Sequence, residues 1–394
     1  MRLLFVASRL PYPPIQGDRV RAYHQLRLLS QSHSITLVAP IQSRKEWEHV
    51  TALGQFCERI EAVPVSKWWG VLRLVNGLFS SLPLQTLYYC DSHIQKRIKR
   101  LLHEEPIDLV HIQMLRMGPV MDGWVGTPKV LDLIDSLSLN WHRRGQREQW
   151  PRSWAILFEA KRLRDYERRL TQQFDKLIVS SSLDKQHIGI YDNIYVVPNG
   201  VDTMAIPFVE NGRESGIIIF SGRMRYFPNA DAAVYFAAQV FPLIRQQIAE
   251  ARLILVGADP PRRIRRLSKM PGIEVTGYVP NLQDCLSRAS VAVAPMRAGS
   301  GMQFKILEAM ANGVPVVTTS YGLGGIEAVS EQHLLVAEGA EAFAGQVVRL
   351  LKDKELRQHL AREARKLVEE KYSWRRCVAK LEAVYKQAIC DHPR

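Results

Sequence analysis

The most informative stretch of the chain is residues 299–317, GSGMQFKILEAMANGVPVV. It opens with a turn between two glycines, whose backbone N–H groups can lie close to an anion. A helix is expected from Gln303 to Ala311, so its positive dipole end lies at the same turn. The helix should end at Asn312-Gly313, and 314–318 then has the pattern of a buried strand.

Two charged side chains of this stretch share one face of the expected helix, because Lys305 and Glu308 are three residues apart. A turn for phosphate, a cation and a carboxylate then meet at a strand–helix junction, which is the layout of a nucleotide-diphosphate site. A strand is expected at 291–294, and a second glycine-rich turn, 322–325, follows the next strand. The alternative is that these are the ordinary glycine turns of any doubly wound domain.

Strand and helix patterns alternate along the whole chain, which predicts an α/β fold with parallel sheets in two Rossmann-like domains. The expected strands lie at 2–7, 35–40, 58–63, 108–112, 129–134, 176–181 and 194–197, then at 216–221, 252–257, 273–276, 291–294, 314–318 and 333–336. Helical patterns include 19–30, 231–247 and 303–311, and helices are expected from 340 to about 390.

The turn formers at 198–202 (PNGVD) suggest a linker between the two series of strands. We therefore expect an N-terminal Rossmann-like acceptor domain at 1–200 and a C-terminal donor domain at 201–375. The segment 376–394 is expected to be a helix that packs back on the N-terminal domain. The expected site is a cleft between the two domains.

Composition limits the class of protein. The chain has 394 residues, 46% hydrophobic and 23% charged, with a net charge of +14 and five scattered cysteines. This indicates a globular protein of a reducing compartment. Nothing resembles a signal peptide, and no run of about 18 apolar residues could span a membrane, so we expect a cytoplasmic protein.

The positive net charge indicates an acidic partner, which could be a nucleic acid, an anionic membrane or an acidic small molecule. No zinc-finger, basic-zipper or RNA-binding pattern is present, which argues against nucleic acid. An apolar stripe at helical spacing runs from Trp68 to Leu82, beside the adjacent Trp69 and two basic residues. It is expected to be either a core helix or an interfacial helix at the inner face of the plasma membrane.

The motifs together resemble the family-four retaining glycosyltransferases of GT-B fold. The resemblance is carried by 198–202, Ser221-Gly222-Arg223-Met224 and Gly277-Tyr278-Val279, by 299–313, and, more weakly, by 11–21 and 108–111. The pattern GSGMQxKxLEAM is especially similar to that of bacterial sugar transferases of exopolysaccharide systems.

The resemblance implies a role for each matching residue. Arg223 would bind the donor diphosphate, supported by Gly299, Ser300, Gly301 and Met302, and Glu308 would hold the ribose hydroxyls. Gly277, Tyr278 and Val279 would contact the base, and Gly17 would face the donor phosphate. Asp135 stands where many members have a histidine near the reacting centre.

Three positions depart from the family pattern. Ser300 replaces the first of two family glutamates, Pro228 replaces a lysine five residues after Arg223, and Gly17-Asp18 replaces a pair of glycines. Lys305 is expected to supply the missing cation. These departures leave the expected donor-binding residues in place, but they change the residues expected to contact the sugar hydroxyls.

The expected reaction moves a sugar from a nucleotide-diphosphate donor to an acceptor hydroxyl, with retention implied by the resemblance. Arg223, Lys305 and a helix N-terminus would stabilise the leaving diphosphate, and no Asp-x-Asp triplet requires a metal. The acceptor proton would pass to Asp135, to His111 or to the leaving phosphate. The acceptor is expected to be lipid-linked or a polysaccharide. Two rival functions remain: a sugar-nucleotide epimerase of GT-B fold, and a non-catalytic sugar-nucleotide or lipid-carrier binding protein.

Overall fold

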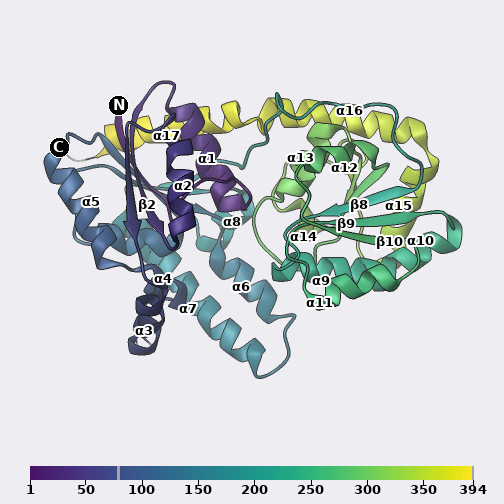
Figure 1. Cartoon of the computed structure of the whole chain (residues 1–394), viewed down its shortest axis with the longest axis horizontal. Helices are drawn as coiled ribbons and strands as arrows, with labels where there is room; N and C mark the ends of the chain where they lie inside the picture. The colour runs from purple at the N-terminus through teal and green to yellow at the C-terminus, as the bar shows by residue number, and fades with distance from the viewer. Residues whose placement is uncertain (78–79, 393–394) are drawn as a thin grey trace. The chain divides into compact units, whose positions relative to one another are not determined.

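A computed structural model of the chain describes residues 1–77 and 80–392 (Figure 1). The chain forms two compact units. The first comprises Met1–Asn199 together with the chain from Cys377 onward, and the second is Gly200–Arg376. Each unit is a parallel sheet with helices on its faces, so the α/β, GT-B-like fold class expected from the sequence is confirmed.

The first unit contains a seven-stranded sheet in the order β3-β2-β1-β4-β5-β6-β7. Its strands are β1 (Arg2–Val6), β2 (Ser34–Ile41), β3 (Arg59–Pro64), β4 (Leu109–Gln113), β5 (Lys129–Ile134), β6 (Lys176–Val179) and β7 (Ile194–Val196). Its helices are α1 (Gly17–Leu29), α2 (Trp47–Val50), α3 (Lys67–Asn76), α4 (Leu84–Tyr89), α5 (Ser92–Glu104), α6 (Leu137–Gly145), α7 (Arg152–Gln173), α8 (Ser182–Ile188) and most of α17 (Trp374–Asp391), with 3₁₀ turns η1 (Arg44–Glu46), η2 (Thr51–Leu53) and η3 (Leu115–Met121).

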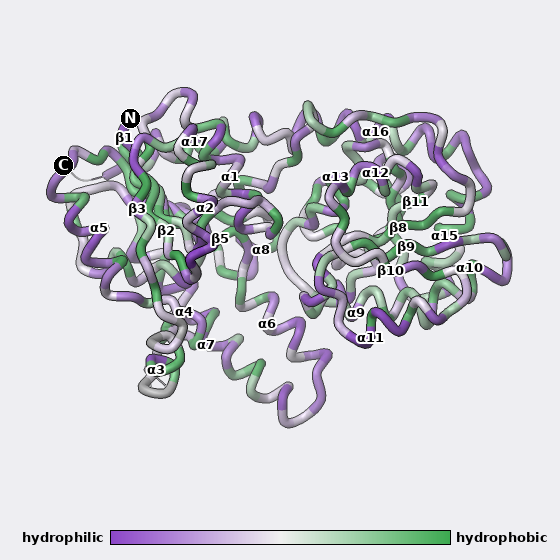
Figure 2. The backbone as a smooth tube through the Cα atoms, viewed as in Figure 1, coloured by the Kyte–Doolittle hydropathy of each residue, from purple (hydrophilic) through white to green (hydrophobic). Residues whose placement is uncertain are grey.

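Side chains alternate between the two faces of this sheet, as a β-strand requires. Leu4 and Val6 of β1 pack against α5 and α7, whereas Leu3 and Phe5 pack against α1 and α17. Both faces are therefore buried, which explains why the strands read as nearly continuous apolar runs. Figure 2 shows these strands as strongly hydrophobic segments.

The second unit contains a six-stranded sheet in the order β10-β9-β8-β11-β12-β13. Its strands are β8 (Ile217–Ser221), β9 (Arg252–Val256), β10 (Ile273–Gly277), β11 (Val291–Ala294), β12 (Val316–Thr318) and β13 (Leu335–Val336). Its helices are α9 (Phe227–Tyr235), α10 (Phe241–Gln247), α11 (Arg262–Arg265), α12 (Leu282–Arg288), α13 (Phe304–Asn312), α14 (Ser320–Leu323), α15 (Ala340–Lys352) and α16 (Lys354–Lys371), with the π turn η4 (Phe236–Val240) and the 3₁₀ turn η5 (Arg266–Lys269).

Local signals in the sequence account for the ends of key helices. α13 ends at Gly313, whose φ of 82° is the left-handed conformation that favours glycine. The helix expected at 231–247 is instead two α-helices, α9 and α10, joined by the π turn η4. Pro242 lies in the first turn of α10, where its missing N–H leaves no hydrogen bond unmade.

Two chain segments at the boundaries of the second unit pair with each other. Val201 and Ser373 form a parallel bridge, and the Val201 amide donates to the Tyr372 carbonyl at 2.8 Å. Gly200 lies so close to Trp374 that a Cβ there would be 2.6 Å from the indole. These contacts join the expected linker to the start of α17.

The apolar stripe expected at Trp68–Leu82 is only partly described. Its first part forms α3, where Trp68, Val71 and Leu72 are exposed, and Leu78 and Phe79 lie outside the described residues. Among the described residues, no helix is long and apolar enough to cross a bilayer.

Candidate active site

The two central strands of the second sheet end side by side. β8 and β11 are hydrogen-bonded neighbours, with β9 and β10 on one side and β12 and β13 on the other. Open parallel sheets bind ligands at such a switch point, beyond the carboxyl ends of the strands. Arg223 follows β8 and the loop 299–302 follows β11, so the fold brings both expected elements to this point.

Close backbone contacts shape the turn before Arg223. A Cβ on Gly257 would lie 1.8 Å from the Gly222 carbonyl oxygen, and a Cβ on Gly222 would lie 3.1 Å from Lys305 Nζ. Only glycine fits at position 257 without moving the backbone. The turns after β8 and β9 are therefore pressed together behind Arg223.

The Arg223 side chain is exposed and makes no hydrogen bond or ion pair with any described residue. Its backbone carbonyl, in contrast, is held, because it accepts from Asn229 Nδ2 at 3.1 Å. The backbone is fixed and the guanidinium remains available for an anion such as a diphosphate.

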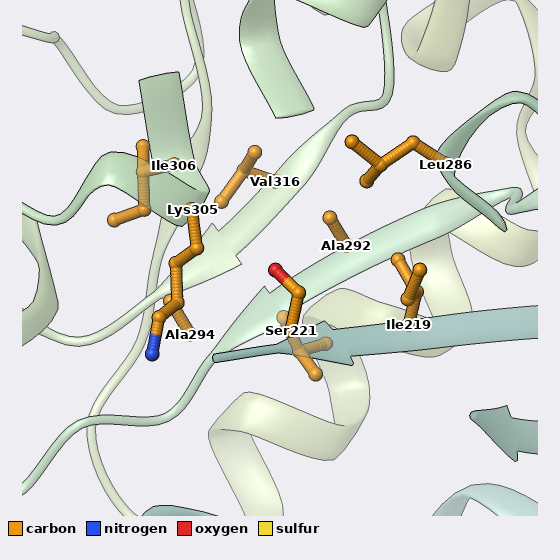
Figure 3. A pocket seen from close by; sticks show the side chains of 9 residues that line it. Ile219, Ser221, Leu286, Ala292, Ala294, Lys305, Ile306 and Val316 are labelled. Atoms are coloured by element: carbon orange, nitrogen blue, oxygen red, sulfur yellow. The ribbon is translucent and has the colours of Figure 1, made fainter. Parts of the chain in front are cut away.

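Lys305 lies in the first turn of α13 and extends past the carboxyl end of β11 (Figure 3). Its Nζ donates to Asn229 Oδ1 at 2.5 Å and lies 4.5 Å from the centre of the Phe220 ring. A small, mainly apolar cavity lies beside its stem, lined by Leu286 and Ile219 among others. Burial lowers the pKa of Lys305 to about 7, although Glu308 opposes this shift.

Lys305 reaches the neighbourhood of Pro228, the position where the family pattern has a lysine. Nζ contacts Asn229, the residue next to the position where the family has its lysine. An ammonium group from α13 therefore reaches the beginning of α9. Asn229 was not singled out from the sequence, and its place in the first turn of a helix that begins at Phe227-Pro228 was the available signal.

Glu308 lies one turn after Lys305 on α13 and is half-buried. Burial raises its pKa to about 7, and Lys305 acts in the opposite direction. Within residues 1–77 and 80–392, its carboxylate forms no hydrogen bond or salt bridge. A half-buried carboxylate without a partner is suited to accept hydrogen bonds from the hydroxyls of a ligand.

The loop 299–302 is buried. Gly299 and Gly301 have φ values of 108° and 72°, and a Cβ on Gly324 would lie 2.3 Å from the Gly301 carbonyl oxygen. The two glycine-rich turns after β11 and β12 are thus in contact, as their order in the sheet requires. The side chain of the N-cap residue Gln303 makes no capping hydrogen bond, and a helix N-terminus of this kind suits an anion. Ser300 and Met302 are both buried in this loop.

The expected base-contacting residues lie at the same edge but two strands from β8. Gly277 ends β10 with a φ of 73°, and nothing lies within 4 Å of a Cβ placed there. Tyr278 is 63% exposed, whereas Val279 packs partly against the core. An open glycine beside an exposed aromatic ring offers a flat surface for a base.

In the first unit, Gly17 begins α1 and is exposed. Asp18, where the family has a second glycine, is held by two arginines. Its Oδ2 lies 3.2 Å from Arg116 Nη2 and 3.6 Å from Arg9 Nε. The departure at this position therefore introduces a carboxylate into a basic environment.

Asp135 follows β5 and is partly exposed. The preceding Ile134 has a φ of 68°, which is strained for a β-branched residue and often marks a functional site. Asp135 accepts from Ser180 Oγ at 2.7 Å. Burial, followed by repulsion from Asp184, raises the pKa of Asp135 to about 8.

His111 corrects one expectation. Its side chain is completely buried in β4, stacked 4.3 Å from Phe5, and Nδ1 lies 2.8 Å from Tyr385 Oη. Burial lowers its pKa to about 4, with a smaller opposing effect of Asp132. The imidazole is neutral and inaccessible, so it belongs to the core between β4 and α17 and not to a candidate site.

Comparison with known sequences finds a family model that matches part of the chain, and remote relatives. Residues 215–353 match the family model "Glycosyl transferases group 1". The chain is 20% identical to an uncharacterized 44.6 kDa protein in the cps region of Klebsiella pneumoniae, over 94% of this chain and 96% of that one. It is 24% identical to a phosphatidyl-myo-inositol mannosyltransferase of Propionibacterium freudenreichii, over 74% and 70%.

Solved structures share the fold over nearly the full length. Sucrose-phosphate synthase from Thermosynechococcus elongatus superimposes with a TM-score of 0.73 at 15% identity, covering 99% of both chains. The Anabaena protein Alr3699/HepE, solved in complex with UDP-glucose, gives a TM-score of 0.67 at 14% identity, covering 98% of this chain and 100% of that one. Residues 215–353 are therefore similar to the group 1 glycosyltransferases, and the whole chain has the fold of these solved structures.

Proposed function

We propose that the protein transfers a sugar from a nucleotide-diphosphate donor to a hydroxyl of an acceptor, with retention of anomeric configuration. One observation carries the proposal. At the switch point of the second sheet, Arg223, which has no side-chain partner among the described residues, follows β8, while the half-buried Lys305 and the N-terminus of α13 follow the neighbouring β11. The complex of Alr3699/HepE with UDP-glucose supports a nucleotide-sugar donor for this chain.

In the proposed reaction, the bond between the sugar and the diphosphate breaks and negative charge develops on the diphosphate. Arg223 and Lys305 stabilise this charge through hydrogen bonds, and the dipole of α13 adds to them. The approach of the diphosphate also favours the protonated form of Lys305. We propose that these groups suffice without a bound metal ion.

Glu308 orients the nucleotide in this proposal. An ionised carboxylate has two acceptor oxygens and can receive hydrogen bonds from both ribose hydroxyls. Gly277, Tyr278 and Val279 contact the base, at the edge of the same sheet.

The acceptor hydroxyl loses its proton either to Asp135 or to the leaving phosphate. Because the pKa of Asp135 is raised to about 8, its carboxyl group is mostly protonated at pH 7. The leaving phosphate is therefore the better proton acceptor at neutral pH. Asp135 becomes available as a base only near or above pH 8.

We further propose that the acceptor is a glycolipid or a growing polysaccharide at the inner face of the membrane. The relatives in a cps region and in phosphatidyl-myo-inositol mannosylation support this class. Large exposed apolar side chains of the first unit include residues on α3 and α7. Trp68 on α3 is 80% exposed, and Trp154 and Phe158 stack 5.9 Å apart on the outer face of α7. Arg152 and Lys161 on α7, and Arg147 before it, are also exposed, and basic side chains suit an anionic bilayer.

Incubation with a panel of nucleotide sugars and a bacterial lipid extract tests this function. Release of nucleoside diphosphate together with an NMR signal for a product of unchanged anomeric configuration is the expected result. Interconversion of the nucleotide sugar without release would indicate an epimerase. Binding without turnover across the panel would indicate a non-catalytic binding protein.

A further inference from the structure

The first sheet has its own switch point, between β1 and β4, and arginines gather there. β2 and β3 lie on one side of this point, and β5, β6 and β7 on the other. Arg9 follows β1, and Arg116 follows β4 in the first turn of η3. The proposed donor site in the second unit uses neither residue.

Arg116 is only 7% exposed. Its Nη2 donates to Ser8 Oγ at 3.1 Å and to Asp18 Oδ2 at 3.2 Å, and the Tyr89 ring lies 4.3 Å from its Cζ. Its Nε is buried without a hydrogen-bond partner. Its Nη1 makes no hydrogen bond with any residue in the described ranges. Three N–H donors of a nearly buried cation are therefore unused.

Arg9 shares the same carboxylate, because its Nε lies 3.6 Å from Asp18 Oδ2. Its side chain is about one-third exposed, so it forms the open side of the cluster. Arg19 and Glu46 pair with each other nearby at 3.4 Å. The five charged groups thus comprise three cations and two anions, which leaves one positive charge uncompensated.

A buried cation with unused donors is unfavourable unless a further partner completes its shell. We propose that Arg9 and Arg116 bind an anionic group of the acceptor, a phosphate or a carboxylate. Arginine forks bind both groups through paired hydrogen bonds. The inference rests on the proposed function, in which Arg223 and Lys305 already serve the donor diphosphate.

The full-length protein, with its donor site first saturated by a nucleoside diphosphate, is titrated with inorganic phosphate and followed by ³¹P NMR and calorimetry. Arg9→Met and Arg116→Lys should each weaken phosphate binding by about ten- to a hundredfold. Asp18→Asn should strengthen it, because the competing carboxylate is removed. Arg100→Met, which alters an exposed arginine on α5, is the matched control and should change nothing.

The increase expected for Asp18→Asn separates ligand binding from a merely structural role, since loss of a structural contact would not tighten binding. Unchanged phosphate affinity in Arg9→Met and Arg116→Lys would overturn the proposal. It would also be overturned if the two variants weakened binding of the nucleoside diphosphate itself, because the arginines would then belong to the donor. If no nucleotide binds but phosphate still depends on Arg9, the proposed function fails while this anion site stands.

Discussion

Arg21 Nε lies 2.7 Å from Asp132 Oδ2, and neither side chain reaches solvent. The other nitrogens of Arg21 donate to the carbonyls of Val197 and Pro198 and to Asn199 Oδ1. Asp132 Oδ1 in turn accepts from the amide of Ile134, the strained residue before Asp135. One buried ion pair therefore holds both the end of β7 and the turn that places Asp135.

Arg21→Met should destabilise the first unit by about 3–5 kcal/mol, because Asp132 is left as an unpaired buried charge. Native-state hydrogen exchange at the amides of β1 and β5 measures the loss. Adding Asp132→Asn should recover part of it, since the orphaned charge is removed. If the losses of stability in Arg21→Met and in Asp132→Asn simply add in the double variant, the two residues are not coupled and this account is wrong.

Arg223→Ala should weaken binding of the nucleoside diphosphate by about ten- to a hundredfold, since a charge-assisted hydrogen bond contributes about 1.5–3 kcal/mol. Calorimetry measures the affinity. Arg252→Ala is the matched control, because Arg252 is exposed at the opposite, amino end of the same sheet. Equal affinity in the parent and in Arg223→Ala would remove Arg223 from the donor site.

Lys305 predicts proton uptake on donor binding. In the free protein its pKa is about 7, so at pH 8 most molecules carry a neutral amine. A bound diphosphate raises this pKa, and the complex then holds more protons than the free protein. Calorimetry at pH 8 in buffers of different ionisation enthalpy should show uptake of up to about one proton per site. Lys305→Met should abolish the uptake, and a buffer-independent enthalpy in the parent would contradict the assignment.

Lys305 also makes stability depend on pH. Between about 7 and the ordinary value of 10.5, an unfolded lysine keeps its proton while the folded one has lost it. The unfolded state then binds more protons, so the free energy of unfolding should rise with pH over this range. The rise should be absent from Lys305→Met in denaturant titrations at pH 7, 8.5 and 10.

Glu308→Gln should reduce the preference for ribonucleotides over 2′-deoxyribonucleotides, because an amide offers one acceptor oxygen where the carboxylate offers two. Affinities of both nucleoside diphosphates for parent and variant give the discrimination ratio. A parent protein that binds the two equally well would exclude Glu308 as the ribose contact.

The exposed aromatic pair on α7 should bind lipid. Replacing Trp154 and Phe158 by serine should abolish sedimentation with vesicles of anionic phospholipid and leave the melting temperature unchanged, since both rings are exposed. Ile190→Ser is the control, because Ile190 is an exposed apolar side chain of the same unit, 94% exposed, that is not on α7. If the double variant still sediments with the vesicles, the pair on α7 does not make the membrane contact.

The strands could be predicted from the sequence because both faces of each sheet are buried, so apolar runs and turn formers alternate regularly. Gly313 likewise signalled the end of α13 through its own backbone preference. His111 could not be assigned this way, because it lies in an apolar strand whose covering residue, Tyr385, is 274 positions later. Periodicity within β4 does not reveal what covers it.

In the candidate site, too, some residues could be predicted from local sequence and others could not. Arg223, Lys305 and Glu308 belong to local motifs, and the order of the strands brings them to one edge. Asn229 and Arg116 were missed because their significance arises from contacts between separate elements: Asn229 with α13, and Arg116 with the loop after β1 and with α1. No spacing in the sequence encodes such contacts.

The bridge between Val201 and Ser373 has a consequence for protein engineering. It holds the first and last residues of the second unit next to each other, since Gly200 and Arg376 lie one and three positions beyond it. A polypeptide cut at these two points would have adjoining termini. Such a unit is suited to circular permutation, or to insertion as a guest domain into a surface loop of an unrelated host.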